Sequence, residues 1–99
     1  MFYEYAELDI KPGEEEAFEA AFREAVPLFQ NAKGCHGVEI QRTVERPSHY
    51  KLVVAWETVE NHMVDFREAP SFQEWRRLVG PHFASAPQVE HTSVAVKGF

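Results

Sequence analysis

The sequence predicts an α+β fold of the ferredoxin-like, split βαβ type, in which helices cover one face of a four-stranded antiparallel sheet. Three observations predict it: the order of strand and helix patterns, a long helix with one apolar stripe, and a third strand that is apolar throughout. A length of 99 residues with 44 % hydrophobic and 26 % charged side chains is typical of one globular domain. We therefore treat residues 1–99 as a single domain without repeats or linkers.

An alternating strand and a long amphipathic helix open the chain. Over residues 2–10, apolar side chains alternate with others in the pattern of a half-buried strand. Residues 14–33 follow the helical period, with an apolar stripe that comprises Phe18, Phe22, Ala25 and Phe29. Pro27 lies within this helix, and we expect it to kink or interrupt the helix because proline lacks a backbone donor.

Two strands joined by a turn form the middle of the chain. Residues 38–45 carry Val38 and Ile40 on one side, and residues 49–56 form the next strand. This third strand is apolar at every position from 52 to 56. Both of its faces should therefore be buried.

A pair of helices and a last strand complete the order. Thr58 is a suitable N-cap for a short helix over residues 59–68. The sequence Ser71-Phe72-Gln73-Glu74 is a capping box that opens a second helix, and Gly80 suits its C′ position. Residues 89–96 then form the last strand, which completes the ferredoxin-like element order.

One face of this sheet has no helices to cover it. Because the third strand is apolar on both sides, the bare face would be an association surface. The last three residues, 97–99, are too few to cover it. We therefore expect a homodimer in which a twofold partner packs its own sheet against this face. Between the sheet and the helices we expect a cavity for a small organic molecule.

The composition argues against several classes of partner. The net charge of −6 argues against nucleic acid, because an acidic domain repels phosphate backbones. No apolar run approaches the roughly 18 residues of a membrane span, and the N-terminus does not resemble a signal peptide. Cys35 is the only cysteine, which fits a reducing compartment, so we expect a cytoplasmic protein. Aromatic residues reach 13 %, more than so small a core requires, so some are candidates for lining a cavity.

Several short motifs resemble the antibiotic biosynthesis monooxygenase (ABM) domain family. The third strand ends in Trp56-Glu57-Thr58, and the helix that follows bears His62. An aromatic-rich second helix carries Phe72-Gln73-Glu74-Trp75, and Gly34-Cys35-His36-Gly37 resembles the family's turn before the second strand. The resemblance covers nearly the whole chain, from Tyr5 to about Val96.

The resemblance implies a dimeric α+β barrel with a pocket in each protomer. Members of the family include cofactor-free oxygenases of aromatic polyketides, haem-degrading enzymes and many proteins of unknown role. The haem-degrading branch relies on an Asn, a Trp and a His, near whose places this chain has Ala6, Asp65 and Trp75-Arg76. These departures argue against haem degradation.

His62 is the first candidate for a catalytic base. It precedes Phe66 by one turn beside an apolar stripe, and a neutral imidazole with a pKa of about 6.5 could deprotonate a phenol or an activated carbon acid. The alternative is a partly buried histidine that is hydrogen-bonded to the backbone. His91 either projects into the same cavity or lies in the dimer interface, depending on its face of the last strand. His36 and His49 lie near turns, where we expect exposed side chains.

Arg67 is the second candidate, because a guanidinium could anchor a carboxylate or stabilise an enolate. It could equally form a surface ion pair with Glu57, Glu60 or Glu68. Aromatic side chains are candidates for the substrate-binding walls, although an aromatic stripe at helical spacing is also typical of plain core. These candidates are Trp56, Phe66, Phe72, Trp75 and Phe83. Trp56 suits both roles, since a buried indole N–H needs a partner.

Two functions remain open from the sequence. The first is a cofactor-independent monooxygenase that acts on a small aromatic or polyketide-like molecule, with His62 as the base and Arg67 and Trp56 as hydrogen-bond donors. The second is a non-catalytic dimer that binds a small ligand, or a stress-related protein with the same fold. We expect no cofactor and no metal, because the chain has neither a glycine-rich phosphate loop nor a metal-binding histidine spacing.

Overall fold

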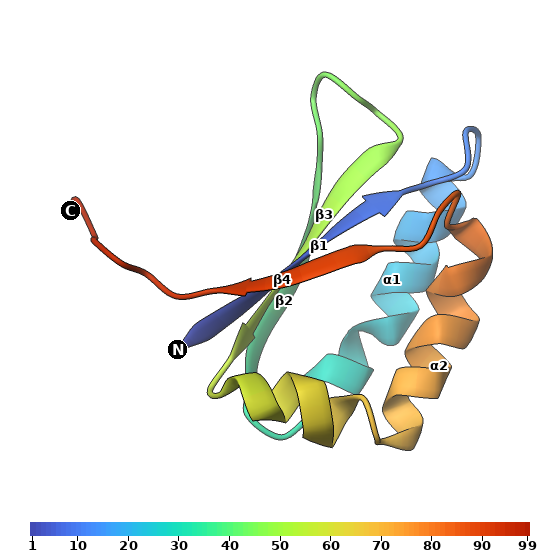
Figure 1. Ribbon diagram of the computed structural model, residues 1–99. Coiled ribbons are helices and arrows are strands. Elements are labelled where there is room, and N and C mark those ends of the chain that lie inside the picture. Colours follow the sequence, from blue (N-terminus) through green and yellow to red (C-terminus); the bar gives the residue numbers. More distant parts are fainter.

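Helices pack against one face of a four-stranded antiparallel sheet, and the other face carries none (Figure 1). The computed structural model describes all residues from 1 to 99. In chain order the elements are β1 (Phe2–Asp9), α1 (Glu15–Gln30), β2 (Cys35–Arg42), β3 (His49–Trp56), the π-helix η1 (Asn61–Phe66), α2 (Pro70–Val79), the 3-10 helix η2 (Gly80–His82) and β4 (Gln88–Thr92). None of these helices has the length and apolar character needed to cross a bilayer.

The strand order of the sheet is β2-β3-β1-β4, so β1 and β3 are the inner strands. In the register of β1, Glu4 lies opposite Val54 of β3 and opposite His91 of β4. This order, with helices on one side, confirms the ferredoxin-like arrangement that the sequence predicts. It also places Glu4 on an inner strand, beside the edge strand that carries His91.

The core lies between the helix-facing side of the sheet and the helices. The predicted apolar stripe of α1 is buried, namely Phe18, Phe22, Ala25 and Phe29. Pro27 does not interrupt this helix, which continues to Gln30, and the N–H of Asn31 donates to the carbonyl of Pro27 at 3.1 Å. Proline stands in the last turn, where its missing donor affects only the hydrogen bond to the preceding turn.

Two of the three caps predicted for the helical pair differ from the structure. Thr58 is a cap as predicted, because its Oγ1 accepts the N–H of Asn61 at 3.1 Å. The capping box at Ser71 is wrong, since α2 already begins at Pro70, whose fixed φ suits the first helical position. Gly80 is not a left-handed C′ glycine, because its φ is −54° and the chain continues into η2.

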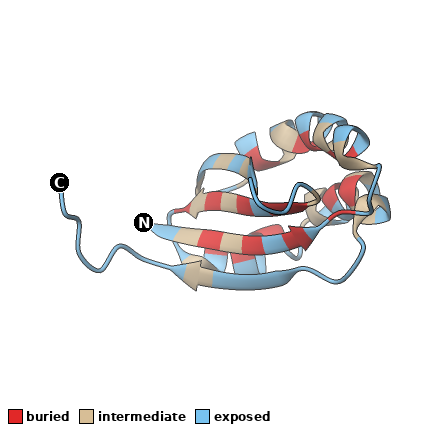
Figure 2. Ribbon diagram, turned by 90° about the horizontal axis from the view of Figure 1, so that it is seen from above, coloured by how far each residue is buried: buried red, intermediate tan, exposed pale blue.

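The last strand is shorter than predicted, because β4 ends at Thr92 and not at residue 96. Residues 93–99 leave the sheet as an extended arm that points away from the domain (Figures 1 and 2). Val94 is 63 % exposed on this arm, Val96 is 87 % exposed, and Phe99 is fully exposed. The arm therefore holds apolar side chains that nothing in the protomer covers.

The face of the sheet without helices is less apolar than the sequence predicts. The half-buried side chains at its centre are Tyr3, Tyr5, Val53 and Ala55. The charged or polar side chains around them are Glu7, Glu39, Gln41, Lys51 and Glu90. The outward positions of β3 stay partly open in the protomer, and their burial by a partner stays a prediction. His49 is the exception: predicted to be exposed, it is buried beside Asp9.

Candidate functional site

A cavity of about 1160 Å³ lies where β1 and β4 face η1 and α2. Its volume exceeds the usual range of small-molecule pockets, roughly 300–1,000 Å³. Six of the eight site residues predicted from the sequence line it: His62, Arg67, Phe72, Trp75, Phe83 and His91. The side chain of His91 points from β4 towards the helices. Of the two positions predicted for it, the cavity and the dimer interface, it therefore lies in the cavity.

The other two predicted residues, Trp56 and Phe66, belong to the core and not to the cavity wall. Trp56 is fully buried, and Phe66 is 4 % exposed. The indole of Trp56 stacks on the imidazole of His62, with ring centroids 5.5 Å apart and planes at 17°. Phe66 stacks on Phe29 with centroids 5.0 Å apart. Trp56 therefore supports the wall from behind and offers no donor to a bound molecule.

Three polar side chains in close contact, Glu4, His62 and His91, form a chain that leads from the core to the cavity. Oε1 of Glu4 accepts the indole N–H of Trp56 at 3.0 Å and lies 3.3 Å from Nε2 of His62. Nδ1 of His62 lies 2.8 Å from Nε2 of His91. Glu4 and His62 are each 5 % exposed, whereas His91 is partly exposed and its Nδ1 makes no hydrogen bond within the protein. The chain thus ends in a ring nitrogen that a bound molecule can reach.

Glu4 is the functional residue that the sequence analysis missed. It has the same strand parity as Phe2, Ala6 and Leu8, so the alternation already assigns it to the inward face. A carboxyl group at such a position is a signal, because a buried carboxyl group is costly unless it is hydrogen-bonded. Here the hydrogen-bonding partner is Trp56, and Nε2 of His62 lies 3.3 Å away.

The π-helical form of η1 brings His62 and Arg67 to the same cavity. The N–H of Arg67 donates to the carbonyl of His62, five residues earlier, at 3.1 Å. In an α-helix, residues five positions apart lie about 140° apart around the axis. In a π-helix they lie nearly above one another, because the hydrogen bond itself joins residues five apart. The α-helical period assumed from the sequence could not have predicted this juxtaposition.

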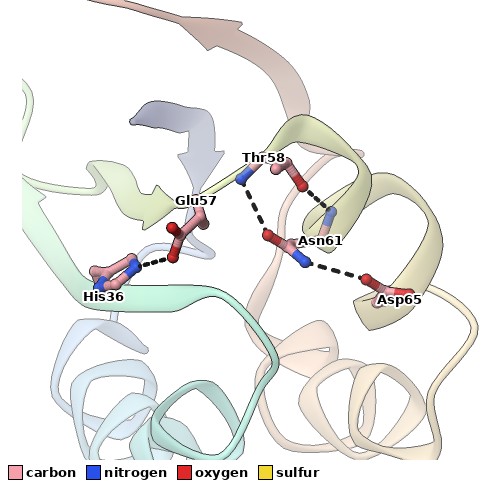
Figure 3. A network of polar contacts seen from close by, with 5 residues as sticks. All are labelled: His36, Glu57, Thr58, Asn61 and Asp65. Carbon is pink, nitrogen blue, oxygen red and sulfur yellow. Dashed lines mark hydrogen bonds and ion pairs between the residues drawn. The ribbon is translucent and has the colours of Figure 1, made fainter.

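The start of η1 lies against Gly34, in the turn that precedes β2, and Figure 3 shows the side-chain contacts of Asn61 at this start. The side chain of Asn61 accepts the N–H of Thr58 at 3.0 Å and donates to Asp65 at 3.1 Å. Gly34 lies directly against this side chain with a φ of +76°, and a Cβ there would be 2.1 Å from Oδ1 of Asn61. The Gly34 carbonyl also accepts the N–H of Glu57 at 2.8 Å. Both the backbone conformation and the contact therefore require glycine at this position.

Burial moves the pKa values of the two inner members of the chain in opposite directions. The pKa of Glu4 rises to about 7, chiefly because burial disfavours its charged form, while the hydrogen bond from Trp56 and the charge of Arg67 lower it in part. The pKa of His62 falls to about 4, again chiefly through burial, with His91 and Arg67 adding to the fall. Near neutral pH, His62 is thus uncharged and Glu4 is close to half-protonated.

Arg67 does not form the ion pair that the sequence left open. Its Nη1 lies 3.8 Å from Sδ of Met63, and none of the ion pairs of the chain includes it. Its guanidinium group therefore stays available at the cavity wall. An arginine in this position can stabilise an anion in the cavity.

The polar groups that line the cavity include imidazoles, a carboxyl group and guanidinium groups. No group of three or more His, Cys, Asp or Glu side chains is arranged to hold a metal ion. The groups present can accept, pass and donate protons, and they can stabilise developing negative charge.

Comparison with known proteins places this architecture in a family. A sequence profile described as antibiotic biosynthesis monooxygenase matches residues 1–78. The uncharacterized protein YczJ of Bacillus subtilis is 40 % identical over 91 residues, which cover 92 % of this chain and 96 % of that protein.

Solved structures give the same result. A candidate antibiotic biosynthesis monooxygenase from Bordetella bronchiseptica is 53 % identical, with a TM-score of 0.94 over 96 % of this chain and 97 % of that one. A protein of the same description from Nitrosomonas europaea shares the fold at 19 % identity, with a TM-score of 0.81 over 97 % of this chain and 100 % of that one. The chain belongs to the antibiotic biosynthesis monooxygenase family.

Proposed function

We propose that this protein is a cofactor-independent monooxygenase that acts on a small aromatic or polyketide-like molecule held in the cavity. The observation that carries the proposal is the row of close polar contacts from Glu4, 3.3 Å from Nε2 of His62, to the hydrogen bond between His62 and His91. In an oxygenase without a cofactor, the substrate anion itself gives an electron to oxygen. The protein then needs a base, an apolar enclosure and a group that stabilises the anion.

The chain of side chains provides a path for the substrate proton. Because His62 is neutral, one of its ring nitrogens donates a hydrogen bond and the other accepts one. When Glu4 is ionised, the Nε2–H of His62 points to Glu4, and its Nδ1 accepts from the Nε2–H of His91. When Nδ1 of His91 takes a proton from the substrate, its Nε2 proton moves to His62 and the Nε2 proton of His62 moves to Glu4. His91 then contacts the substrate, while His62 and Glu4 act through it.

The overall reaction balances with molecular oxygen as the only oxidant. An activated CH₂ group of the substrate loses a proton to His91, and the resulting carbanion transfers one electron to oxygen. The two radicals combine to a peroxide anion, which takes the stored proton back through His91, and the hydroperoxide then loses water to leave a carbonyl group. One oxygen atom stays in the product, and the other leaves as water with the two hydrogens of the original carbon.

The walls of the cavity suit a flat apolar molecule. Phe72, Trp75 and Phe83 contribute aromatic surface, and Trp75 is 7 % exposed and held by edge contacts with Phe22 and Phe29. Arg67 supplies the positive charge that favours the anionic form of the substrate. The donor role first considered for Trp56 is not part of the proposal, because its N–H is bonded to Glu4.

Oxygen uptake tests the proposal directly. We would supply a panel of hydroxylated aromatics that carry an activated CH₂ group, including 1,8-dihydroxyanthrone, to the wild type and to His62→Ala and His91→Gln. We expect stoichiometric oxygen consumption by the wild type and a loss of about a hundredfold in each variant, the usual size of a general-base contribution. His91→Gln changes a partly exposed side chain, so it tests the path even where His62→Ala disturbs folding.

His36→Ala is the matched control, because His36 lies on β2 outside the cavity and pairs with Glu57. It should consume oxygen like the wild type. Wild-type protein that binds these compounds but consumes no oxygen above background would overturn the proposal and favour a non-catalytic ligand-binding role. Equal uptake by His91→Gln and the wild type would remove the proton path from the mechanism.

We also propose that the working unit is a homodimer. The apolar centre of the open sheet face and the exposed valines of residues 93–99 support it, because one protomer covers neither. Sedimentation at micromolar concentration should give twice the protomer mass of 11.4 kDa. A chain truncated after Thr92 should form a weaker dimer, which dissociates at a higher protein concentration than the dimer of the full chain. A full-length protein that sediments as a protomer would overturn the assembly.

A further inference from the structure

We propose that the cavity selects aromatic acids, and that Arg67 and Arg76 bind the carboxylate of the substrate beside the ring of Phe72. This inference rests on the proposed function, because it concerns the same cavity, and it names the class of substrate. It does not depend on whether oxygen chemistry follows binding.

The two arginines gather around one aromatic ring. The guanidinium carbon of Arg67 lies 5.9 Å from the centroid of Phe72, and that of Arg76 lies at the same distance. Arg67 follows η1, while Phe72 and Arg76 lie four positions apart on α2 and therefore on one side of that helix. All three residues line the cavity.

Neither arginine has an acidic partner, although the chain is rich in carboxylates. Acidic residues outnumber lysine and arginine by 16 to 10. Arg42 pairs with Glu19 at 3.7 Å, and Arg77, next to Arg76, pairs with Glu74. Arg67 and Arg76 enter no ion pair within 4.0 Å. Two unpaired guanidinium groups at one cavity wall form a site for an anion from outside the chain.

The chemistry of the site favours a carboxylate on a flat ring system. A guanidinium group binds a carboxylate through two parallel N–H···O bonds, and it also stacks on aromatic faces. Phe72 and Trp75 offer aromatic surface next to the charge, so one ligand can satisfy both. A carboxylate is also the anion that an aromatic hydroxy acid carries beside the ring that would react.

Anaerobic titration with two probes that differ only in the carboxylate tests the inference. We would follow tryptophan fluorescence while adding 1,4-dihydroxy-2-naphthoate or 1,4-dihydroxynaphthalene under nitrogen. The wild type should bind the acid at least tenfold more tightly than the diol. Arg67→Gln and Arg76→Gln should each weaken binding of the acid about tenfold, and Arg76→Gln should change binding of the diol less than twofold.

Arg77→Gln is the matched control, because it removes a guanidinium group from the same cavity wall. The guanidinium group of Arg77 differs from the other two because it already forms an ion pair with Glu74. This variant should change the affinity for the acid less than twofold. Thermal unfolding of each variant checks that it is folded, and all three arginines are exposed. Equal affinities of the wild type for the two probes would overturn the inference, and so would an equal loss in Arg77→Gln and Arg76→Gln.

Oxygen uptake with 1,8-dihydroxyanthrone separates this inference from the proposed function. If the acid binds as expected but the wild type consumes no oxygen with 1,8-dihydroxyanthrone, the oxygenase proposal fails and the anion site stands. If 1,8-dihydroxyanthrone is oxidised by the wild type and the acid is not bound, the anion site fails and the oxygenase proposal stands.

Discussion

On the cavity side of the sheet, Glu4 lies 3.3 Å from Nε2 of His62, and on the opposite side Asp9 lies 3.0 Å from Nδ1 of His49. Both carboxylates belong to β1, and both histidines are buried. The carboxylates differ in their access to water, because the side chain of Glu4 is 7 % exposed and that of Asp9 is 59 % exposed.

This difference in exposure, together with the hydrogen bond that Asp9 forms with its histidine and Glu4 does not, reverses the titration of the two carboxyl groups. Burial raises the pKa of Glu4 to about 7, whereas the hydrogen bond from His49 lowers the pKa of Asp9. The charged form of a solvent-exposed carboxylate is stabilised by its histidine partner, which lowers its pKa. A buried carboxylate is poorly solvated, which raises its pKa. The inner pair can therefore exchange protons near neutral pH, while the outer pair is a structural contact.

The largest expected effect is on the pH dependence of stability. Glu4 has a raised folded-state pKa, so its contribution is fully present below pH 4.5 and is lost as the pH rises through about 7. The loss amounts to about 3 kcal/mol in the free energy of unfolding. As the pH rises from 4.5 to 8, the free energy of unfolding of Glu4→Gln should therefore increase by about 3 kcal/mol relative to that of the wild type, as measured by urea unfolding.

In the wild type alone, the pH dependence from His62 partly cancels that from Glu4, so the stability of the wild type must be compared with that of Glu4→Gln. His62 has a lowered pKa, and its contribution is present above pH 6.5 and lost as the pH falls through about 4. Over the shared range, the slopes of Glu4 and His62 have opposite signs. A constant stability difference between Glu4→Gln and the wild type from pH 4.5 to pH 8 would contradict the raised pKa of Glu4.

The second expected effect is on catalysis. Glu4→Gln keeps an acceptor for the Trp56 N–H but removes the group that stores the substrate proton, so oxygen uptake should fall about a hundredfold, or about 2.7 kcal/mol. In the wild type, uptake should rise with pH through about 7, and this rise should vanish in Glu4→Gln. Asp9→Asn should keep wild-type uptake, and a similar loss there would show that the two faces do not differ in function.

The third expected effect concerns the placement of His62 itself. Gly34→Ala should destabilise the protein by about 2 kcal/mol, because alanine is strained at a φ of +76° and its Cβ would meet Asn61, which starts η1. Gly80→Ala is the control, since Gly80 has a helical φ and open space around it, so the change should be neutral or slightly stabilising. Thermal unfolding compares the two, and equal midpoints would refute the close contact at Gly34.

The smallest expected effect lies on the outer face. Asp9→Asn should cost less than about 1 kcal/mol at pH 7, because Asp9 is well exposed and its pairing with His49 is screened by water. Its lowered pKa means that this contribution is present above pH 3.8 and fades as the pH falls further. Urea unfolding at pH 7 and pH 3 should show the difference shrink, in the opposite sense to Glu4→Gln.

Much of the fold could be predicted from the sequence, because it depends on periodicity and element order. The alternation of β1 and the stripe of α1 match the structure, and the apolar run of β3 forms a strand as predicted, with only its helix-facing side buried in the protomer. The predicted helix start at Ser71 was wrong because Pro70 is an equally good first residue for the helix. Propensity alone could not rank these two starts.

The site was predicted only in part, for physical reasons that differ between residues. His62, Arg67 and His91 were found because their chemistry is conspicuous, but Glu4 was overlooked among the apolar neighbours of its strand. Trp56 was assigned to the wall, yet it lies one layer behind, which only the packing of His62 on its indole reveals. The π-helical turn was not predictable, because no residue pattern in η1 distinguishes it from an α-helix.

The arm of residues 93–99 has a practical consequence for work on the isolated chain. It continues from β4, an edge strand, so it offers unpaired backbone donors and acceptors together with exposed valines to any neighbouring molecule. A purification tag fused after Phe99 would be attached to the part of the chain that is most open to association. Recombinant preparations that differ only in the end that carries the tag are therefore not equivalent samples.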